Sequence, residues 1–298
     1  RPEVAHTGRG ARRAAPVTAL HTPAPGFHLE YFNGLGGFVE DGKEYAIVLG
    51  PGQTTPAPWV NVIANADFGF LVSESGAGFA WSGNSREHQL THWSNDPVCD
   101  QTGQAFFIRD RDTGELLSPT AAPLRDPAAT YVARHGKGYS RFQHEGGGLS
   151  LVLLEYVPVS DPLRISRLRI ANRSSERRRL SVCAYVEWTL GSSRTVSAPF
   201  VVTSQDATGA ILAVNRWNAA FKQRVAFADL GGRQESWTGD RREFIGRNGS
   251  LSYPAALASD APLSGRLGAG LDPCTAMRTD VEIASGESIE LVFLVGDA

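Results

Sequence analysis

The segment from 68 to 100, FGFLVSESGAGFAWSGNSREHQLTHWSNDPVCD, concentrates aromatic and hydrogen-bonding side chains in one short β-like stretch. Trp81 and Trp93 stand in it beside an Arg-Glu pair and an Asn-Asp pair. A solvated loop does not need such aromatics, and a plain core strand does not carry so many polar groups. Flat apolar faces next to bidentate polar groups are what a site for polyhydroxylated ligands requires. We therefore predict a substrate-binding patch formed by Arg86, Glu87, Trp93, Asn95 and Asp96.

Two pairs of carboxylates have the residue types for acid and base roles in glycoside cleavage: Glu87 with Asp96, and Asp240 with Glu243. Each pair has an arginine next to it in the sequence. An arginine partner lowers the pKa of a carboxyl group, which is the wrong direction for a general acid. The sequence therefore favours structural ion pairs at these positions, and we assign no catalytic residue.

Other common chemistries find little support. His88 and His92 lie four residues apart, which suits metal ligation on a helix, but on a strand they would be roughly 13 Å apart. Gly191-Ser192-Ser193 lacks the second glycine of a nucleophile elbow. No phosphate-binding loop or dinucleotide fingerprint follows a predicted strand. We therefore predict no metal and no cofactor.

The composition is that of a globular chain, with 42% hydrophobic and 20% charged residues among 298. The formal net charge of −2 gives no basic excess, so nucleic acid is not an expected partner. The three cysteines, an odd number without a CxxC pair, predict unpaired thiols and a reducing compartment. The longest apolar run, Leu151–Leu154, is far too short to span a membrane.

Short apolar runs separated by glycine-rich turns predict an all-β antiparallel sandwich over 27–298. Phe106–Arg109 and Glu115–Leu117 form one predicted hairpin, and Gly136–His144 pairs with Leu149–Val157 in another. Leu163–Ala171 is predicted as a strand with its apolar residues on one face and its arginines on the other. Single helical turns are predicted at Pro254–Ser259 and Leu271–Ala276.

Residues 1–26, rich in Ala, Pro, Thr and Arg, are predicted to be a disordered linker or arm. The chain begins with Arg1, and its only methionine is Met277. We therefore expect it to be a piece of a longer polypeptide.

The chain resembles the N-terminal β-sandwich of glycoside hydrolase family 94, which is glycosyltransferase 36-like. Several strings of its sequence match that domain and occur in the same order. Within that family it looks most like the phosphorylase-like module of cyclic β-1,2-glucan synthases. The matching strings are YFNGLGGFVEDGKEY (Tyr31–Tyr45), TPAPWVNVIAN (Thr55–Asn65), FGFLVSESGAGFAWSGNSRE (Phe68–Glu87), WSNDPV (Trp93–Val98), DRREFIGRNGSL (Asp240–Leu251), GAGLDPC (Gly268–Cys274) and ELVFLVGDA (Glu290–Ala298).

The resemblance implies an antiparallel β-supersandwich like that of galactose mutarotase, preceding an (α/α)6 barrel that carries the general acid. In that family, phosphate attacks the anomeric carbon with inversion. Because the resemblance places the general acid on the barrel, this chain alone is expected to be inactive. Its expected partners are a β-glucan, the barrel of the parent chain and a contact between two copies. Its expected location is the cytoplasmic side, as a soluble domain of a larger protein associated with the inner membrane.

Two other functions stay open at the level of sequence. One is an autonomous aldose epimerase or polysaccharide lyase on the same scaffold, and the other is a scaffolding domain without sugar contact. An epimerase needs a histidine acid and a glutamate base that converge on one sugar. Only Glu87 with His88 or His92 comes close, and neighbouring residues on a strand point to opposite faces.

Overall fold

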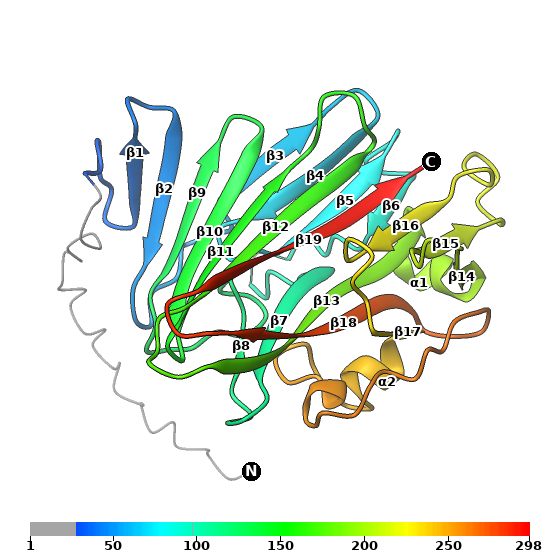
Figure 1. Cartoon of the computed structure of the whole chain (residues 1–298). Coiled ribbons are helices and arrows are strands. Elements are labelled where there is room, and N and C mark those ends of the chain that lie inside the picture. The colour runs from blue at the N-terminus through cyan, green and yellow to red at the C-terminus, as the bar shows by residue number, and fades with distance from the viewer. Residues whose placement is uncertain (1–27, 97) are drawn as a thin grey trace, which may run out of the picture.

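The computed structural model describes residues 28–96 and 98–298, and the predicted arm over 1–26 lies outside this range. Within the described residues, nearly all regular structure is β, and two large antiparallel sheets pack face to face (Figure 1). The prediction of an all-β antiparallel supersandwich is therefore confirmed. The fold follows from short apolar strands whose alternate side chains face a common interior.

The first sheet has ten strands in the described residues, and its order shows that the last strand in sequence, β19, lies between β12 and β16. In spatial order its members are β1 (Gly36–Val39), β2 (Glu44–Leu49), β9 (Tyr131–Gly136), β10 (Tyr139–Gly146), β11 (Leu149–Tyr156), β12 (Leu163–Asn172), β19 (Ser288–Asp297), β16 (Ala226–Asp229), β15 (Ile211–Asn215) and β14 (Val201–Gln205).

The second sheet has nine strands in the described residues and is built around the long strand β13. Seven follow one another as β17 (Ser236–Asp240), β18 (Pro273–Ile283), β13 (Arg178–Gly191), β6 (Gln89–Thr91), β5 (Gly78–Ser82), β4 (Phe68–Ser73) and β3 (Val60–Ala64). Strand β7 (Gln104–Asp110) also pairs with β13 and continues into β8 (Leu116–Leu117).

The main core fills the space between the sheets. Strand β11 alternates strictly between buried and partly exposed residues, as a strand with one face on a core must. Trp188 is fully buried in this core, and its indole Nε1 donates to Thr275 Oγ1 at 2.8 Å, so its role is packing. A second apolar cluster lies on the other face of β13, where α2 (Arg241–Ile245) covers Tyr185 and Phe107.

Both predicted hairpins are present, as β7 with β8 and as β10 with β11. The predicted turn at Pro254–Ser259 corresponds to the 3-10 helix η2 (Ala255–Leu257). The turn predicted at Leu271–Ala276 is wrong, because β18 begins at Pro273 and pairs with β13. Two short helices, α1 (Arg194–Ser197) and α2, and the 3-10 helix η1 (Ala198–Phe200) were not predicted.

The arginines of β12 do not share one face, contrary to the expectation. Arg164 points inward with Leu168 and Ile170, whereas Arg167 and Arg169 point outward. The buried guanidinium of Arg164 lies 3.6 Å from Glu155 and 5.2 Å above the Phe70 ring centroid. The flip has a simple origin: a strand alternates every second residue, so positions 164 and 167 cannot face the same side.

The three cysteines provide one prediction. All are free; Cys99 is exposed, and Cys183 and Cys274 are buried. Burial raises the pKa of the Cys183 thiol to about 12, so it has almost no thiolate at neutral pH. A thiol titration should count three groups under denaturing, non-reducing conditions and only Cys99 in the native protein. A denatured count of one would show a disulfide and contradict the structure.

His135 provides a second prediction. Burial lowers its pKa to about 4, and its Nδ1 lies 2.9 Å from Ser140 Oγ. The unfolded chain binds the proton near pH 6.5, whereas the folded chain binds it only near pH 4, so stability falls as the pH falls between these values. The free energy of unfolding should drop by about 1.4 kcal/mol per pH unit from this group. Urea unfolding at several pH values measures it.

His135→Gln is the matched control, because glutamine can keep the bond to Ser140 but does not titrate. Its unfolding free energy should depend less steeply on pH in the same window. Identical pH slopes for the two proteins would contradict the role given to His135.

Candidate functional site

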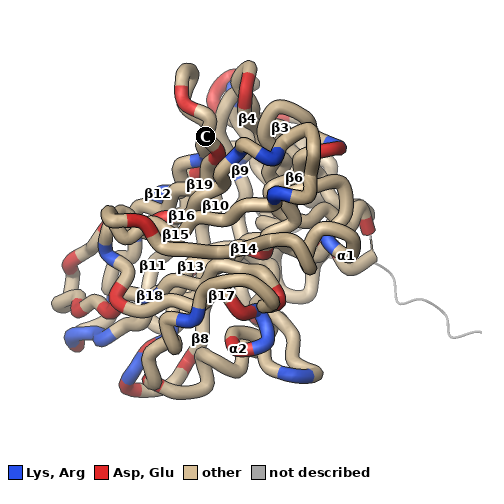
Figure 2. Tube along the Cα trace, turned by 90° about the vertical axis from the view of Figure 1, so that its right-hand side faces the viewer, with Lys and Arg blue, Asp and Glu red and all other residues tan. Residues whose placement is uncertain are grey.

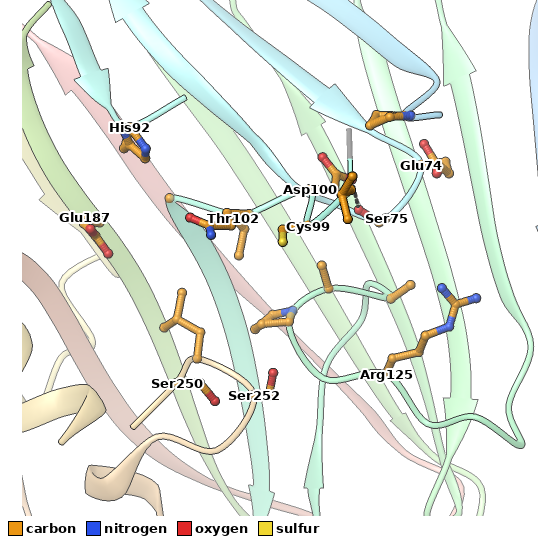
Figure 3. Close-up of a pocket in the computed structure, with 18 of the residues that line it drawn as sticks. Glu74, Ser75, His92, Cys99, Asp100, Thr102, Arg125, Glu187, Ser250 and Ser252 are labelled. Atoms are coloured by element: carbon orange, nitrogen blue, oxygen red, sulfur yellow. Dashed lines mark hydrogen bonds between the residues drawn. The ribbon is translucent and has the colours of Figure 1, made fainter. Parts of the chain in front are cut away.

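A pocket of about 550 Å³ lies on the outer face of the nine-stranded sheet (Figure 3). Glu187 of β13 lines it, and because Trp188 beside it faces the core, Glu187 must face outward. His92 and Thr102 lie near Glu187 at one end, and Glu74 with Arg125 lies at the other (Figure 3). The walls come from α2 and from the loops 54–58, 98–103, 121–125 and 249–252.

The turn after β4 fixes the far end of the pocket. Gly76 has φ +87, and a Cβ there would lie 2.5 Å from Thr120, so only glycine fits. The carboxylate of Asp100 accepts hydrogen bonds from Ser73 at 2.7 Å and from Ser75 at 2.5 Å. These bonds tie the loop before β7 to the turn, so two segments distant in sequence form one wall.

Glu187 is the centre of a network of charges at the other end. Its Oε2 accepts from Tyr185 Oη at 2.8 Å and from Arg241 Nε at 2.9 Å. Its Oε1 pairs with Arg194 at 2.5 Å. Asp272 completes the network through ion pairs with both arginines. Each oxygen of this buried carboxylate therefore lies next to a guanidinium group, as a buried charge requires.

The network depends on where the two short helices begin. Arg194 opens α1 directly after β13, and Arg241 opens α2 after β17. Asp240 caps α2 by accepting from the backbone N–H of Arg242 at 3.1 Å. The Arg241 backbone N–H also donates to Asp272 O at 2.8 Å, so the guanidinium is carried into the pocket by a fixed backbone.

His92 supplies a neutral imidazole to the pocket. Burial is the main cause that lowers its pKa, and nearby Arg194 lowers it further although Glu187 opposes. Its Nδ1 has no hydrogen-bond partner among the described residues. At neutral pH the ring is thus uncharged and has one donor and one acceptor nitrogen.

Burial also raises the pKa of Glu74, whose carboxylate accepts from Thr55 and from the Trp59 backbone N–H at 2.8 Å. The remaining lining mixes the serine hydroxyls of 250 and 252 with small apolar side chains. The apolar members are Ala57, Pro58, Val98, Ala121, Ala122, Pro123, Ile245 and Leu251.

The pocket can therefore bind a compact ligand with both hydroxyl groups and C–H faces. Its volume lies within the usual range for small-molecule sites of about 300–1,000 Å³. Both carboxylates and arginines line it, so the pocket does not select a ligand of one charge sign. In the described part of the chain, no group of three or more His, Cys, Asp or Glu side chains could hold a metal ion.

Three of the predicted site residues lie on the loop between β6 and β7, which also carries pocket residues. Trp93 is 39% exposed and stacks on Phe79, with ring centroids 4.9 Å apart. Asn95 has φ +48, and Asp96 accepts from the backbone N–H groups of Val98 and Cys99. These backbone bonds lower the pKa of Asp96. The three residues shape the loop, but none lines the pocket itself.

The other two predicted residues lie apart from the pocket. Arg86 and Glu87 occupy the turn between β5 and β6 and form an exposed ion pair at 3.2 Å. Asn84 Oδ1 accepts from both of their backbone N–H groups at 2.9 Å, which explains the turn. The structure therefore does not bring Arg86 and Glu87 together with Trp93, Asn95 and Asp96 in one pocket.

The remaining sequence candidates are structural. His88 is buried, stacks on Phe221 with centroids 4.4 Å apart, and faces Asp297 at 3.4 Å. Asp240 pairs with Arg242 and Arg266, as the ion-pair interpretation predicted. Glu243 accepts from Thr238 and Ser264 instead.

The sequence reasoning missed Glu187 and its arginine partners. One signal was available: Glu187 is the single charged residue in the otherwise uncharged run Leu180–Gly191. A charge in such a strand needs a partner, but the sequence does not show that Arg194 and Arg241 provide it.

Several known proteins are similar to this chain in sequence. The model of the glycosyl hydrolase 94 supersandwich domain matches residues 43–298. The chain is 43% identical over 274 residues to the cyclic beta-(1,2)-glucan synthase NdvB of Rhizobium meliloti (strain 1021), covering 92% of this chain and 10% of the synthase. It is 29% identical over 157 residues to the N,N'-diacetylchitobiose phosphorylase of Vibrio furnissii, covering 51% of this chain and 19% of the phosphorylase.

Among solved structures, a bacterial glucoamylase complexed with acarbose aligns with a TM-score of 0.47 and 5% identity, over 85% of this chain and 36% of the glucoamylase. No helix in the described residues is long and apolar enough to cross a membrane. The family resemblance read from the sequence is confirmed by the match over 43–298. The chain belongs to the glycosyl hydrolase 94 supersandwich domain family.

Proposed function

We propose that this chain is a non-catalytic carbohydrate-binding domain of a longer glucan synthase or glycoside phosphorylase, and that its pocket holds a short segment of β-glucan. The observation that carries the proposal is the pocket on the outer face of β13, where His92, Arg241 and serine hydroxyls face small apolar side chains. The similar proteins include a cyclic β-1,2-glucan synthase and an N,N'-diacetylchitobiose phosphorylase, which supports the same ligand class.

A sugar offers hydroxyl groups around its rim and C–H groups on its faces. The pocket has matching features, because charged and hydroxyl groups at its two ends frame apolar residues such as Ala121 and Leu251. Charges of both signs are present, which favours a neutral ligand over an anion or a cation. The volume of about 550 Å³ suits a short oligosaccharide segment.

Trp93 extends the proposed site along its rim. Its ring is held flat on Phe79 and keeps a large exposed face, which is suitable for stacking on a sugar beyond the pocket. Asp96 holds the loop that carries Trp93 and the pocket residue Cys99, and Asn95 turns its backbone with a φ of +48. For Arg86 and Glu87 the binding role stays a prediction from the sequence.

The contacts of Glu187 argue for binding without catalysis and against the epimerase alternative. His92 and Glu187 do share one pocket, as the acid and base of an epimerase would. Glu187, however, is ion-paired with Arg194 and Arg241 and accepts from Tyr185, which are the contacts of a carboxylate that holds the structure together. A general base must lie within hydrogen-bond reach of the proton that it removes, whereas the contacts of Glu187 direct its carboxylate toward protein side chains.

A neighbouring apolar surface supports the proposed contact with a helical barrel of the parent chain. Val60 and Val62 of β3 are 48% and 58% exposed on the outer side of the nine-stranded sheet. Leu71 lies opposite Val62 and is partly exposed, whereas Phe79, opposite Leu71, is covered by Trp93, so the apolar surface extends from β3 to the exposed ring of Trp93. We further propose that the whole protein places this domain on the cytoplasmic side of an inner membrane.

Binding to the pocket can be tested with a blocking variant. Ser252 lines the pocket but is exposed, so Ser252→Trp should fill the entrance without disturbing the core. Calorimetric affinity for β-1,2-linked glucooligosaccharides should fall about tenfold or more, which is about 1.4 kcal/mol. Trp217→Ala, at an exposed tryptophan that does not line the pocket, is the matched control. Equal affinity in Ser252→Trp and the wild type, with unchanged melting temperature, would refute the pocket site.

The rim role of Trp93 gives a separate measurement. Trp93→Ala should weaken glucan binding by about 1–3 kcal/mol while the fold survives, because it removes a large exposed contact face. A side chain that served only the core would instead cost roughly 3–5 kcal/mol of stability with affinity unchanged. Arg86→Ala, measured in parallel, decides whether the exposed Arg86–Glu87 pair contributes to binding.

Catalytic silence is the third expectation for this site. The chain should not accelerate the mutarotation of freshly dissolved α-glucose above the buffer rate. It should also release no glucose 1-phosphate from β-1,2-glucan and phosphate. Polarimetry and a coupled phosphate-ester assay measure the two rates. Mutarotation that disappears in His92→Gln would establish an epimerase and overturn the binding-only role.

A further inference from the structure

A second hollow lies on the opposite side of the sandwich, on the outer face of the ten-stranded sheet. It is a groove of about 640 Å³ whose floor is formed by Val152 and Leu154 of β11. Strand β11 lies between β10 and β12 (Figure 1), and its alternate residues Leu151 and Leu153 point into the core. The floor residues therefore face away from the core and from the pocket described above.

Strand register arranges the groove residues in rows. Tyr139 of β10 lies directly opposite Tyr156 of β11, so two tyrosines stand side by side at one end. The next outward row places Arg141 opposite Leu154, which in turn lies opposite Arg167 of β12. Aromatic groups thus lie next to planar guanidinium groups on one continuous face.

Tyr139 is fixed in place by its neighbours. A Cβ at Gly136 would lie 2.4 Å from the tyrosine ring, so the ring lies against a glycine that has no side chain to displace it. The Tyr139 hydroxyl donates to Glu44. Burial, together with this hydrogen bond, raises the pKa of Tyr139 to about 12, so the phenol stays protonated. A ring held in this way offers a contact surface that loses little entropy on binding.

The charges along the groove nearly cancel. Its lining contains three arginines and three glutamates. Arg167 is bound by Glu290 through two bonds of 2.9 Å to different oxygens, and Arg169 donates to Ser288. Arg141, in contrast, has no hydrogen-bond or ion-pair partner among the described residues, and it is only half-buried. The groove therefore has hydrogen-bonding capacity but lacks the excess positive charge that a polyanion would require.

Figure 2 shows the same balance on a larger scale, because Lys and Arg are interspersed with Asp and Glu in that view.

The length of the groove follows from β11. Its three outward residues from Val152 to Tyr156 extend over roughly 13 Å at the rise of a β-strand. That length accommodates more than one sugar unit of an extended chain.

We propose that this groove is a second carbohydrate-binding site, which holds a neutral, extended glycan chain along β11. Tyr156 and Tyr139 provide the stacking surface, and Arg141 donates to hydroxyl groups of the chain. The site is separate from the pocket beside Glu187, and it stands whether or not that pocket binds sugar. Two sites on opposite faces of one domain would let the domain hold a long polymer more firmly than a short one.

The experiment compares a linear β-1,2-glucan polymer with a β-1,2-linked tetrasaccharide, both titrated against the whole chain. Tyr156→Ala and Arg141→Ala should each weaken polymer binding about tenfold, since each removes a central contact. The matched controls are Tyr31→Ala and Arg177→Ala, which change exposed residues outside the groove. Melting temperatures establish that each variant is folded, and Tyr156→Phe should bind as the wild type because it keeps the ring.

Ser252→Trp separates the two sites. If both sites bind glycan, this pocket variant should still retain the polymer, and its combination with Tyr156→Ala should abolish retention. If only the groove binds, Tyr156→Ala alone should abolish it. Polymer affinity unchanged by both Tyr156→Ala and Arg141→Ala would overturn the groove site, whatever the pocket does. Binding of heparin that is lost in Arg141→Ala, without any effect on glucan, would also overturn it, since it would show an anion site.

Discussion

Strand β13 is buried on both faces, and most of the structure follows from that constraint. Val186 and Trp188 face the core between the sheets, while Tyr185 and Glu187 face the second layer formed by α2. A carboxylate on such a strand cannot rely on water, so it needs charged partners. Arg194 and Arg241 have to be delivered from both sides, and the two short helices that carry them are fixed accordingly. Loss of either arginine would leave a buried charge partly uncompensated, which is strongly destabilising.

The same layer explains why a pocket exists at all. The cluster around Phe244 covers only the part of the outer face formed by β7, β13 and β18. In the neighbouring part formed by β3, β4 and β5, Trp93 covers Phe79 but Val60 and Val62 stay exposed, and the hollow lies between this part and the cluster around Phe244. Its polar end is therefore the edge of a structural ion network, which makes the groups rigid before any ligand arrives. Rigid donors favour binding, because little freedom is lost when the ligand is held.

Much of the fold could be predicted from local patterns, and much of the site could not. The hairpins β7–β8 and β10–β11 connect neighbouring strands, so turn residues and alternation were sufficient. Arg164 was assigned to the wrong face because the alternation of the strand was not counted strictly, and its burial beside Glu155 is a contact between strands. The helix α2 was missed although Asp240 with Glu243 three residues later is a start signal, because five residues are too few to show a helical period. Trp93 was identified by residue type, but its ring position depends on Phe79 across the sheet. Pairings such as that of Glu187 with Arg241 join residues far apart in sequence, where local patterns carry no information.

The position of β19 has a consequence for biosynthesis. Along this domain it leaves the ribosome after every other strand of the described residues, yet it lies inside the first sheet and pairs with β12 on one side and β16 on the other. Until residues 288–297 emerge, β12 is an edge strand with one side unpaired. The unit of β14, β15 and β16 then has no hydrogen-bonded neighbour in the rest of its sheet. Such an edge invites pairing with other nascent chains. The domain must therefore close in one late, long-range step, and a slow translation pause before residue 288 would prolong the period in which it is prone to aggregate.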